Sequence, residues 1–430
     1  MKVICLTKFS DLGLAEPILR ALSDEGYDAP TPIQQQTIPA MIAGKDILGT
    51  AQTGTGKTAA FVLPLLNRLA DAPGRPDAKA CRALVLAPTR ELAAQIVESV
   101  RPYSAHMRIS VTMIIGGVKI SKQVRAMQRG MDIVVATPGR LLDLKSQNAI
   151  RLDQVETVVL DEANHMMDMG FLPQIRKVLD HLPAKRQTVL LSATMPKDIR
   201  ALADKFLKDP VSIAVAAVSK PVERIDQSVR FLTPNQKRDA LTEILSGKDV
   251  ESAIVFTRTK RGADRVSRHL EQAGLASGAI HGNKSQNQRI KTLDAFKERQ
   301  LRVLVATDIA ARGIDIDMVS HVVNFELPNV PESYVHRIGR TARAGATGTA
   351  VTLCAPDERK LLRDIEKLIG NRLPGSELAG PEESSDDKPK AAFRPEKDGQ
   401  RRRKPRRRGP RRPSGNKAQG QGQRQSSRAT

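Results

Sequence analysis

The sequence contains no tryptophan, and aromatic residues make up only 3% of its 430 residues. Bases of single-stranded nucleic acids stack on aromatic side chains, so a chain this poor in them would hold any nucleic acid mainly through the sugar-phosphate backbone. There is also no apolar run long enough to span a membrane. The N-terminal apolar patch of Val3, Ile4 and Leu6 is too short for a signal peptide, because Lys8 and Asp11 follow it. We therefore expect a soluble cytoplasmic protein with no membrane partner.

Cysteine is nearly absent as well. Cys5, Cys81 and Cys354 stand singly, without the spacing of metal ligands. We expect them to be reduced thiols, and we expect no structural metal and no disulfide framework.

Positive charge, in contrast, is abundant. The formal net charge is +22 and the isoelectric point is about 10.2, which indicates a polyanionic partner. Residues 388–430 hold 16 Lys and Arg against Glu396 and Asp398, so this segment alone supplies +14 of the total. The segment 401–412 has nine basic residues in twelve, spaced by Pro and Gly. Such a tail either binds RNA through its charge or only solubilises the chain, and we favour RNA binding.

From about residue 45 onward, short β-type runs alternate with helical stretches. This alternation predicts an α/β fold in which parallel sheets are covered by helices on both faces. The strands expected in the first half are 47–50, 83–87, 111–115, 133–136, 155–160, 188–191 and 211–215. Those expected in the second half are 229–232, 253–256, 303–306, 321–325 and 350–353. We also expect a helix over 11–22 in the segment that precedes the first strand.

The pattern lapses around Ser219-Lys220-Pro221 and ends near Gly370, where Pro, Gly, Ser, Gln and Arg take over. We therefore predict a first domain over 1–215, a linker over 216–225, a second α/β domain over 226–369 and a disordered Arg-rich tail over 370–430.

The stretch 157–164 reads Thr-Val-Val-Leu-Asp-Glu-Ala-Asn. An apolar run that ends in acids is typical of a buried strand that carries charge to the ligand edge of a sheet. Alone, it would fit a strand followed by a solvated acidic turn equally well. The run Ala51-Gln-Thr-Gly-Thr-Gly-Lys57-Thr58 upstream decides between the two, because it lies between a predicted strand and a predicted helix. Such a loop wraps a phosphate, with Lys57 on the β/γ-phosphates and Thr58 on Mg2+.

With these two motifs in place, the chain resembles the DEAD-box ATP-dependent RNA helicases of superfamily 2, and most nearly their bacterial RhlE-like group, which has a basic C-terminal extension. The resemblance covers about residues 9–369, as two tandem RecA-like domains with a Q motif at 9–34. The family motifs occur in order at Phe9 and 26–34, 51–58, 88–92, 116–117, 137–140, 161–164, 192–194, 255–257, 286–289, 307–315 and 336–343.

The resemblance implies an ATP site that uses Mg2+. Tyr27 would stack on adenine and Gln34 would pair with its edge. Asp161 would join Thr58 at the metal, and Glu162 would accept a proton from the attacking water. The remaining nucleotide-binding residues implied are Thr53, Gly54, Thr55, Gly56, Lys57 and Asp315. Arginine fingers would come from the second domain, with the family's coupling histidine, as Arg340, Arg343 and His336.

The resemblance also implies contacts to the RNA backbone, where Gly permits close approach, Thr donates to phosphate oxygens and Arg forks onto phosphate. The residues implied are Pro88, Thr89, Arg90, Gly117, Thr137, Arg140, Thr257, Arg289 and Thr307.

Two positions depart from the family pattern. Ala342 stands where the family usually has Gly, which matters only if this residue needs a positive φ. Asn164 replaces the last acid of the family motif, which links hydrolysis to domain closure through Ser192, Thr194 and the motif histidine. Asn keeps one acceptor but loses the charge, so we expect about 1 kcal/mol of lost coupling. The neighbouring His165 has no role that the motifs supply, and we expect it on a helix surface.

We expect an RNA-dependent ATPase that unwinds short duplexes or remodels ribonucleoproteins, with ribosomal particles or RNA-decay machinery as the partners typical of the group. One alternative is an RNA clamp or annealing factor whose hydrolysis is poorly coupled to unwinding. Another is a DNA-translocating helicase.

Overall fold

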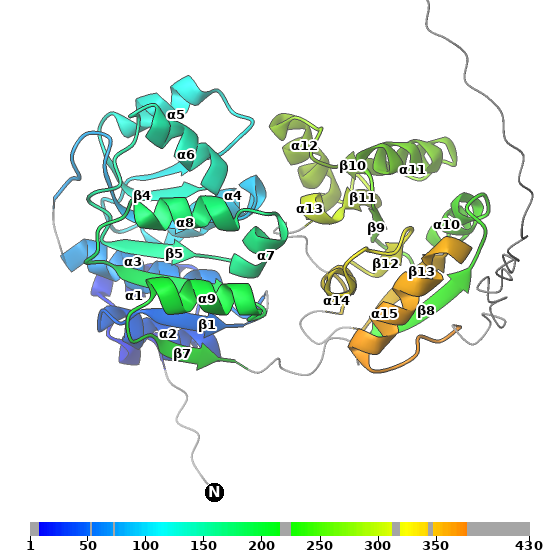
Figure 1. Cartoon of the computed structure of the whole chain (residues 1–430), viewed down its shortest axis with the longest axis horizontal. Coiled ribbons are helices and arrows are strands. Elements are labelled where there is room, and N and C mark those ends of the chain that lie inside the picture. The colour runs from blue at the N-terminus through cyan, green and yellow to red at the C-terminus, as the bar shows by residue number, and fades with distance from the viewer. Residues whose placement is uncertain are drawn as a thin grey trace, which may run out of the picture. The chain divides into compact units, whose positions relative to one another are not determined.

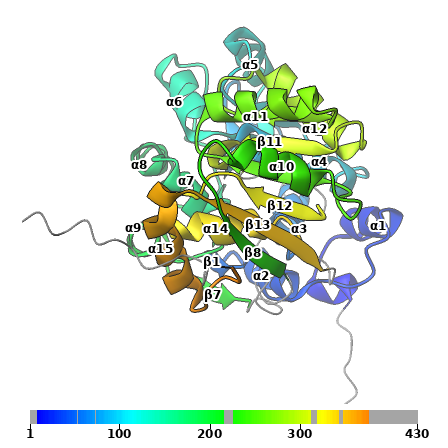
Figure 2. The same cartoon turned by 90° about the vertical axis from the view of Figure 1, so that its right-hand side faces the viewer.

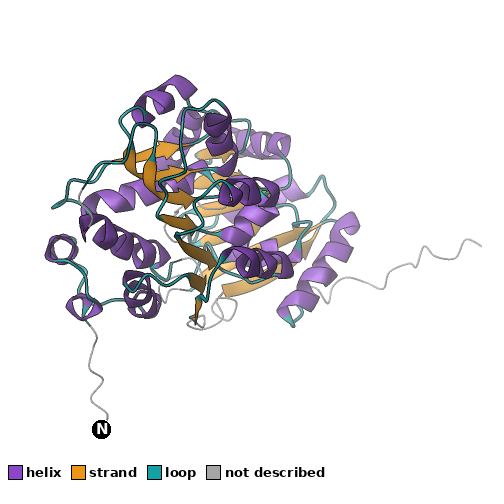
Figure 3. Cartoon of the chain, turned by 60° about the vertical axis from the view of Figure 1, so that its left-hand side comes forward, coloured by secondary structure: helices purple, strands orange, loops and turns teal. Residues whose placement is uncertain are grey.

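The computed structural model describes residues 8–51, 54–71, 74–215, 225–311, 319–342 and 347–375. The predicted linker, apart from Ile225, and the tail from residue 376 lie outside these ranges. The described residues form two parallel sheets, each enclosed by helices (Figures 1 and 3). The predicted α/β fold with two parallel-sheet domains is confirmed.

The first sheet has seven strands in the order β3-β4-β2-β5-β6-β1-β7, and every pairing is parallel. Its strands are β1 (Ile47–Thr50), β2 (Cys81–Leu86), β3 (Val111–Ile114), β4 (Met131–Ala136), β5 (Thr157–Leu160), β6 (Gln187–Ser192) and β7 (Val211–Ala214). Its helices are η1 (Phe9–Leu12), α1 (Glu16–Asp24), α2 (Pro32–Ile42), α3 (Lys57–Asp71), α4 (Arg90–Tyr103), α5 (Ile120–Met127), α6 (Pro138–Ser146), α7 (Ala163–Asp168), α8 (Leu172–Asp180) and α9 (Lys197–Phe206).

Successive strand residues pack into separate cores on the two faces of this sheet. Val159 joins the core under α1 to α4, and Val158 joins the core under α6, α8 and α9. This two-sided burial explains why the central strands read as unbroken apolar runs.

The second sheet has six strands in the order β10-β11-β9-β12-β13-β8, again all parallel. Figure 2 shows β12, β13 and β8 side by side. Its strands are β8 (Ile225–Phe231), β9 (Ala253–Thr257), β10 (Ser277–Ile280), β11 (Val303–Thr307), β12 (His321–Asn324) and β13 (Gly348–Cys354). Its helices are α10 (Lys237–Leu245), α11 (Lys260–Gln272), α12 (Gln286–Lys297), α13 (Asp308–Ala311), α14 (Pro331–Ile338), η3 (Pro356–Glu358) and α15 (Arg359–Ile369).

Two local expectations were wrong. The helix expected over 11–22 is interrupted at Gly13, which has a φ of 78°, and α1 starts only at Glu16. Strand β10 was missed. Residues beyond the predicted end at 369 also contact the second sheet, because the Val229 amide donates to the Pro374 carbonyl at 2.9 Å. None of the helices within the described ranges is both long and apolar enough to cross a bilayer.

Candidate functional site

Three of the predicted motifs follow strands that are neighbours in the first sheet. Strands β5, β6 and β1 are consecutive and parallel, so their carboxyl ends share one edge. β1 leads into the phosphate loop, β5 leads into Asp161 and Glu162, and β6 ends at Ser192. This edge is where open α/β sheets bind their ligands.

The phosphate loop depends on glycine. Gly54 and Gly56 have φ values of 83° and 91°, and helix α3 begins directly after them at Lys57. A Cβ atom on Gly56 would lie 2.5 Å from the Gln34 amide nitrogen, so only glycine admits that side chain. Gln34 donates through Nε2 to the Gly56 carbonyl at 3.2 Å and accepts from the Thr31 amide at 2.8 Å. The structure thus adds a contact with the phosphate loop to the adenine role that the motif implies.

Tyr27, the residue expected to stack on adenine, is 47% exposed. Its ring packs edge-on against Tyr103, with the ring centroids 6.0 Å apart. The contact with Tyr103 therefore fixes the orientation of the exposed Tyr27 ring at the surface beside the Q motif.

Lys57 and Glu162 form a buried ion pair across 105 residues of sequence. The Lys57 ammonium donates to Glu162 Oε1 at 2.5 Å, and both side chains are almost inaccessible to solvent. A buried pair of this kind holds both groups in fixed positions, because removing either partner leaves the other charge unpaired.

The carboxyl group of Asp161 has the features of a cation ligand. Asp161 is 2% exposed, and its Oδ1 has no hydrogen-bond partner among the described residues. Burial raises the pKa of Asp161 to about 7, the charge of Glu162 adds to this, and Lys57 opposes it. A buried carboxylate oxygen without a donor, with the Thr58 hydroxyl in the first turn of α3, fits the oxygen ligands that Mg2+ prefers.

Glu162 lies in a strained backbone conformation at the start of α7. Its φ and ψ are 54° and 51°, in the left-handed region that costs a non-glycine residue about 1–3 kcal/mol. Burial favours its neutral form, but the positive charge of Lys57, then of His165 and Arg340, keeps the pKa of Glu162 below its ordinary value. The pKa values of the two adjacent carboxyls are therefore shifted in opposite directions, and Lys57 keeps Glu162 ionised, as a proton acceptor must be.

The expectation that His165 lies on a helix surface was wrong. His165 is 3% exposed, and its Nδ1 lies 3.7 Å from Glu162 Oε2. Its ring packs edge-on against that of His336, with the centroids 5.2 Å apart. Helix α7 is only six residues long and packs against β6 and α9, which leaves its first residues enclosed. The sequence signal that could have indicated this burial was the position of His165, four residues after Asp161.

Asn164 contacts the Ser-Ala-Thr motif directly. Its Oδ1 accepts from the Ser192 hydroxyl at 2.9 Å and from the Ala193 amide at 3.3 Å. The Ser192 hydroxyl also lies 2.6 Å from the Thr194 carbonyl. Since a hydroxyl carries one hydrogen, Ser192 can donate to only one of the two oxygens at a time. The three residues expected to couple the motifs are thus brought together.

In the second domain, the arginine motif contributes a residue that the sequence analysis did not single out. Arg337 is the largest fully buried side chain among the described residues, and its guanidinium forks onto Asp308 at 2.6 and 2.7 Å. It also donates to the Glu326 carbonyl at 2.6 Å and to Asn324 at 3.1 Å. Arg337 therefore joins the ends of β11 and β12 to helix α14. Its place inside the run 336–340 was the only signal.

The rest of the arginine motif is described in part. Arg340 is buried, and its charge acts on Glu162. Ala342 has a φ of 55°, so the position where the family usually has glycine does require the left-handed region. Three expected site residues lie outside the described ranges: Thr53, Asp315 and Arg343.

Most residues expected to contact RNA line one cleft of about 370 Å³. From that expected set it contains Pro88, Thr89, Arg90, Thr137, Arg140 and Arg289. Three residues of the same motifs that had no assigned role also line it, namely Glu91, Gly116 and Gly139. The motifs did not include the other lining residues, which are Asp143, Met169, Phe171, Gly282 and Ile309. The half-buried ring of Phe171 gives this cleft an aromatic wall in a chain with few aromatic residues.

Protein groups already orient several of these side chains. Arg289 on α12 forms an ion pair with Glu91 on α4 at 2.9 Å, and Gln286 donates to the same carboxylate at 3.0 Å. Gly117 has a φ of 77°, and a Cβ atom there would lie 2.0 Å from Arg90 Nη1. Gly117 therefore admits the Arg90 guanidinium, which explains the glycine without any RNA contact.

The two remaining threonines lie apart from the cleft lining. Thr257 is fully buried, and its hydroxyl donates to the Thr259 carbonyl at 3.3 Å. Thr307 is 8% exposed at the end of β11. The RNA contacts expected of these two residues stay predictions.

Comparison with known proteins gives consistent matches. The DEAD/DEAH box helicase family matches residues 31–202, and the helicase conserved C-terminal domain family matches residues 236–345. The DEAD-box ATP-dependent RNA helicase CshA of Geobacillus kaustophilus is 45% identical over 368 residues, which cover 86% of this chain and 78% of the relative. ATP-dependent RNA helicase CshA of Listeria monocytogenes is 45% identical over 370 residues, covering 86% and 70%. Among solved structures, S. cerevisiae Dbp5 bound to RNA and ADP BeF3 matches with a TM-score of 0.75 and 31% identity, covering 85% of this chain and 95% of that one.

Proposed function

Because this chain belongs to the DEAD-box ATP-dependent RNA helicases, we propose a specific role for each part of the site described above. The enzyme is an RNA-dependent ATPase that uses ATP with Mg2+ and acts on RNA. The proposal concerns which of its residues bind the nucleotide, which bind RNA, and how the two sets are coupled.

At the nucleotide site, Lys57 and the backbone of Gly54 to Gly56 bind the phosphates, and Thr58 and Asp161 hold Mg2+. The cation supplies charge neutralisation at the phosphates, while Glu162 accepts the proton of the attacking water. Tyr27 and Gln34 bind adenine, and Thr53, Thr55 and Asp315 complete the set that the motifs imply. The buried Asp161 Oδ1, which has no hydrogen-bond partner among the described residues, supports the cation role, and the ion pair with Lys57, which keeps Glu162 ionised, supports the role of proton acceptor.

Arg340 and Arg343 neutralise charge that develops during phosphoryl transfer. Support for Arg340 is its electrostatic effect on Glu162. His336 couples the second domain to the acidic motif, and its packing against His165 supports that contact. Asn164, Ser192 and Thr194 link this motif to the strand-β6 end.

The cleft of about 370 Å³ binds the RNA backbone without reading its sequence. Pro88, Thr89, Arg90, Thr137, Arg140 and Arg289 line it, and we retain Gly117, Thr257 and Thr307 as residues that flank it. The three arginines that already lie at its wall need little reorganisation to meet phosphate.

We further propose that the protein belongs to the bacterial RhlE-like group and is located in the cytoplasm. There it acts on single strands and short duplexes of RNA, in ribosomal particles or in RNA decay. The basic segment 388–430 supports the group and RNA tethering. The domain division at 1–215, 226–369 and 370–430 belongs to the same proposal.

The observation that carries this proposal is the buried set of Lys57, Asp161 and Glu162 at one sheet edge, beside a cleft lined by arginines. The test combines two assays on the full chain, ATP turnover and strand displacement, each with single-stranded RNA and with DNA of the same sequence. We expect turnover that RNA stimulates more than DNA, with displacement of short duplexes. Equal stimulation by DNA would contradict the RNA assignment, and turnover without displacement would favour the clamp alternative.

A further inference from the structure

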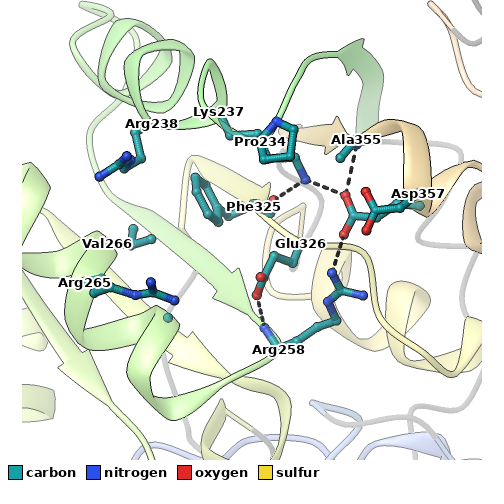
Figure 4. A pocket seen from close by; sticks show the side chains of 12 residues that line it. Pro234, Lys237, Arg238, Arg258, Arg265, Val266, Phe325, Glu326, Ala355 and Asp357 are labelled. Carbon is teal, nitrogen blue, oxygen red and sulfur yellow. Dashed lines mark hydrogen bonds and ion pairs between the residues drawn. The ribbon is translucent and has the colours of Figure 1, made fainter.

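The second domain contains a separate pocket of about 320 Å³ to which no motif assigns a role (Figure 4). It lies where strands β9, β12 and β13 end and helices α10 and α11 begin. Its lining consists of Pro234, Lys237, Arg238, Arg258, Gly262, Arg265, Val266, Phe325, Glu326, Ala355, Asp357 and Glu358. None of these residues lines the cleft described above.

One side of the pocket is a fixed network around Glu358. This carboxylate is 1% exposed and pairs with Lys237 at 2.5 Å and with Arg258 at 3.2 Å. It also accepts from the backbone amides of Leu327 at 3.1 Å and Ala355 at 3.0 Å. Because four donors contact one carboxylate, the side chains on this side of the pocket are held in position without a ligand.

The other side carries charge that is free to meet a ligand. Arg238 and Arg265 are both exposed, and neither guanidinium has an ion pair or hydrogen bond with any described residue. In Figure 4 they lie on the same side as Val266, and the ring of Phe325 projects between them and the ion pairs of Lys237 and Arg258. Phe325 is only partly buried.

The partly exposed ring of Phe325, with the Lys237 ammonium 5.8 Å from its centroid, lines the pocket together with two guanidinium groups that have no partner among the described residues. This combination matches the chemistry of a nucleotide. The base can stack on the ring, and the phosphate can accept from the arginines. An acidic protein segment would satisfy the arginines but would leave the ring unused. The pocket also begins at Arg258, directly after Thr257, which we have proposed to flank the RNA path.

We propose that this pocket binds one unpaired nucleotide of the RNA where the strand continues beyond the cleft, with Phe325 under the base and Arg238 and Arg265 on the phosphate. The inference rests on the proposed function, since it requires that RNA occupy the cleft. It adds a subsite that strengthens binding of long strands and leaves binding of short strands unchanged.

The test measures affinity by fluorescence polarisation for a short single-stranded RNA of about 8 nucleotides and for the same RNA extended at either end to about 20. The proteins are the full chain, its R238E/R265E variant, and Arg268→Glu as a control on the same exposed face of α11 outside the pocket. All are compared at one salt concentration, because binding to phosphates depends on salt. We expect R238E/R265E to bind one of the extended RNAs roughly tenfold more weakly while binding the short RNA as the parent does.

A second arm separates base stacking from charge. Extension with abasic nucleotides keeps the phosphates and removes the bases, and it should recover only part of the gain in affinity. Phe325→Leu, which keeps an apolar side chain, should lose the part that depends on the bases. Competition by adenosine monophosphate against the extended RNA tests whether a free nucleotide enters the same pocket, and effective competition at low concentration would contradict the RNA assignment.

The results distinguish this inference from the proposed function. If the parent chain shows no RNA-stimulated ATP turnover, the proposed function fails. If turnover is stimulated but R238E/R265E and Arg268→Glu weaken all RNAs equally, the pocket inference fails alone. A third outcome would assign the pocket to an acidic protein. In that case R238E/R265E binds every RNA as the parent does, and a fluorescent acidic peptide that poly-glutamate can displace binds to the parent but not to the variant.

Discussion

The amide oxygen of Asn164 accepts a hydrogen bond from the Ser192 hydroxyl at 2.9 Å, with both residues buried. The same oxygen accepts from the Ala193 amide. Asn therefore retains the acceptor geometry of the missing carboxylate towards the Ser-Ala-Thr motif, and what it lacks is negative charge.

Asn164→Asp should raise RNA-stimulated ATP turnover and strand displacement by roughly fivefold, because both hydrogen bonds to Ser192 and Ala193 become charge-assisted. Steady-state turnover and displacement, measured at saturating ATP and RNA, check this. Asn164→Ala, which removes the acceptor, should lower both rates. Equal rates for Asn and Asp would show that charge at this position has no part in coupling.

Glu162→Gln should lower ATP turnover by at least about 100-fold while nucleotide binding persists, since the amide cannot accept the proton from water. Single-turnover hydrolysis and titration with a fluorescent ATP analogue measure the two effects separately. Glu98→Gln, on the exposed face of α4, is the matched control and should behave as the parent. Near-normal hydrolysis by Glu162→Gln would exclude this residue as the base.

Ala342→Gly should stabilise the protein by about 1 kcal/mol, because Ala342 has a φ of 55° and glycine adopts this region without the steric cost of a Cβ. Urea denaturation of the full chain measures the change for the transition of the second domain. Ala240→Gly in helix α10 has ordinary helical backbone and should instead destabilise by roughly 0.5–1 kcal/mol. A loss of stability in both variants would mean that Ala342 is not strained.

Acidification should destabilise the second domain through His321. Burial lowers the pKa of His321 from its ordinary 6.5, and Asp249, 3.3 Å away, opposes this only in part. Because the pKa of His321 is lower in the folded chain, the unfolded chain binds a proton at a higher pH than the folded chain does. Stability is therefore lost as pH falls below about 6.5. Thermal melts across this range should show a smaller loss for His321→Asn. Asp249→Asn should enlarge the loss, because it removes the charge that favours the protonated ring.

The architecture was largely predictable because its strands are buried on both faces and read as apolar runs. Strand β10 escaped because Ser277-Gly278-Ala279-Ile280 is weak in β-branched residues. Its glycine is required by packing, since a Cβ on Gly278 would lie 2.7 Å from Leu301. Such a requirement arises only once distant segments are folded together.

The residues of the candidate site also fall into those that local sequence motifs predict and those that depend on the folded structure. Lys57, Asp161 and Glu162 follow from local motifs, and their shared sheet edge follows from strand order. The burial of His165 and the fork of Arg337 onto Asp308 depend on which helix faces they meet. The pocket around Phe325 draws on four separated segments, so no local pattern could have indicated it.

The network around Glu358 also has a thermal consequence. Its single carboxylate joins the start of α10, the end of β9 and the segments after β12 and β13, and its pairing with Lys237 spans 121 positions of sequence. Neither Lys237 nor Arg258 can detach from Glu358 without leaving this buried carboxylate short of a charged partner. On heating, the pocket should therefore persist intact up to the melting of its domain and then vanish in one step, with no intermediate range of partial affinity.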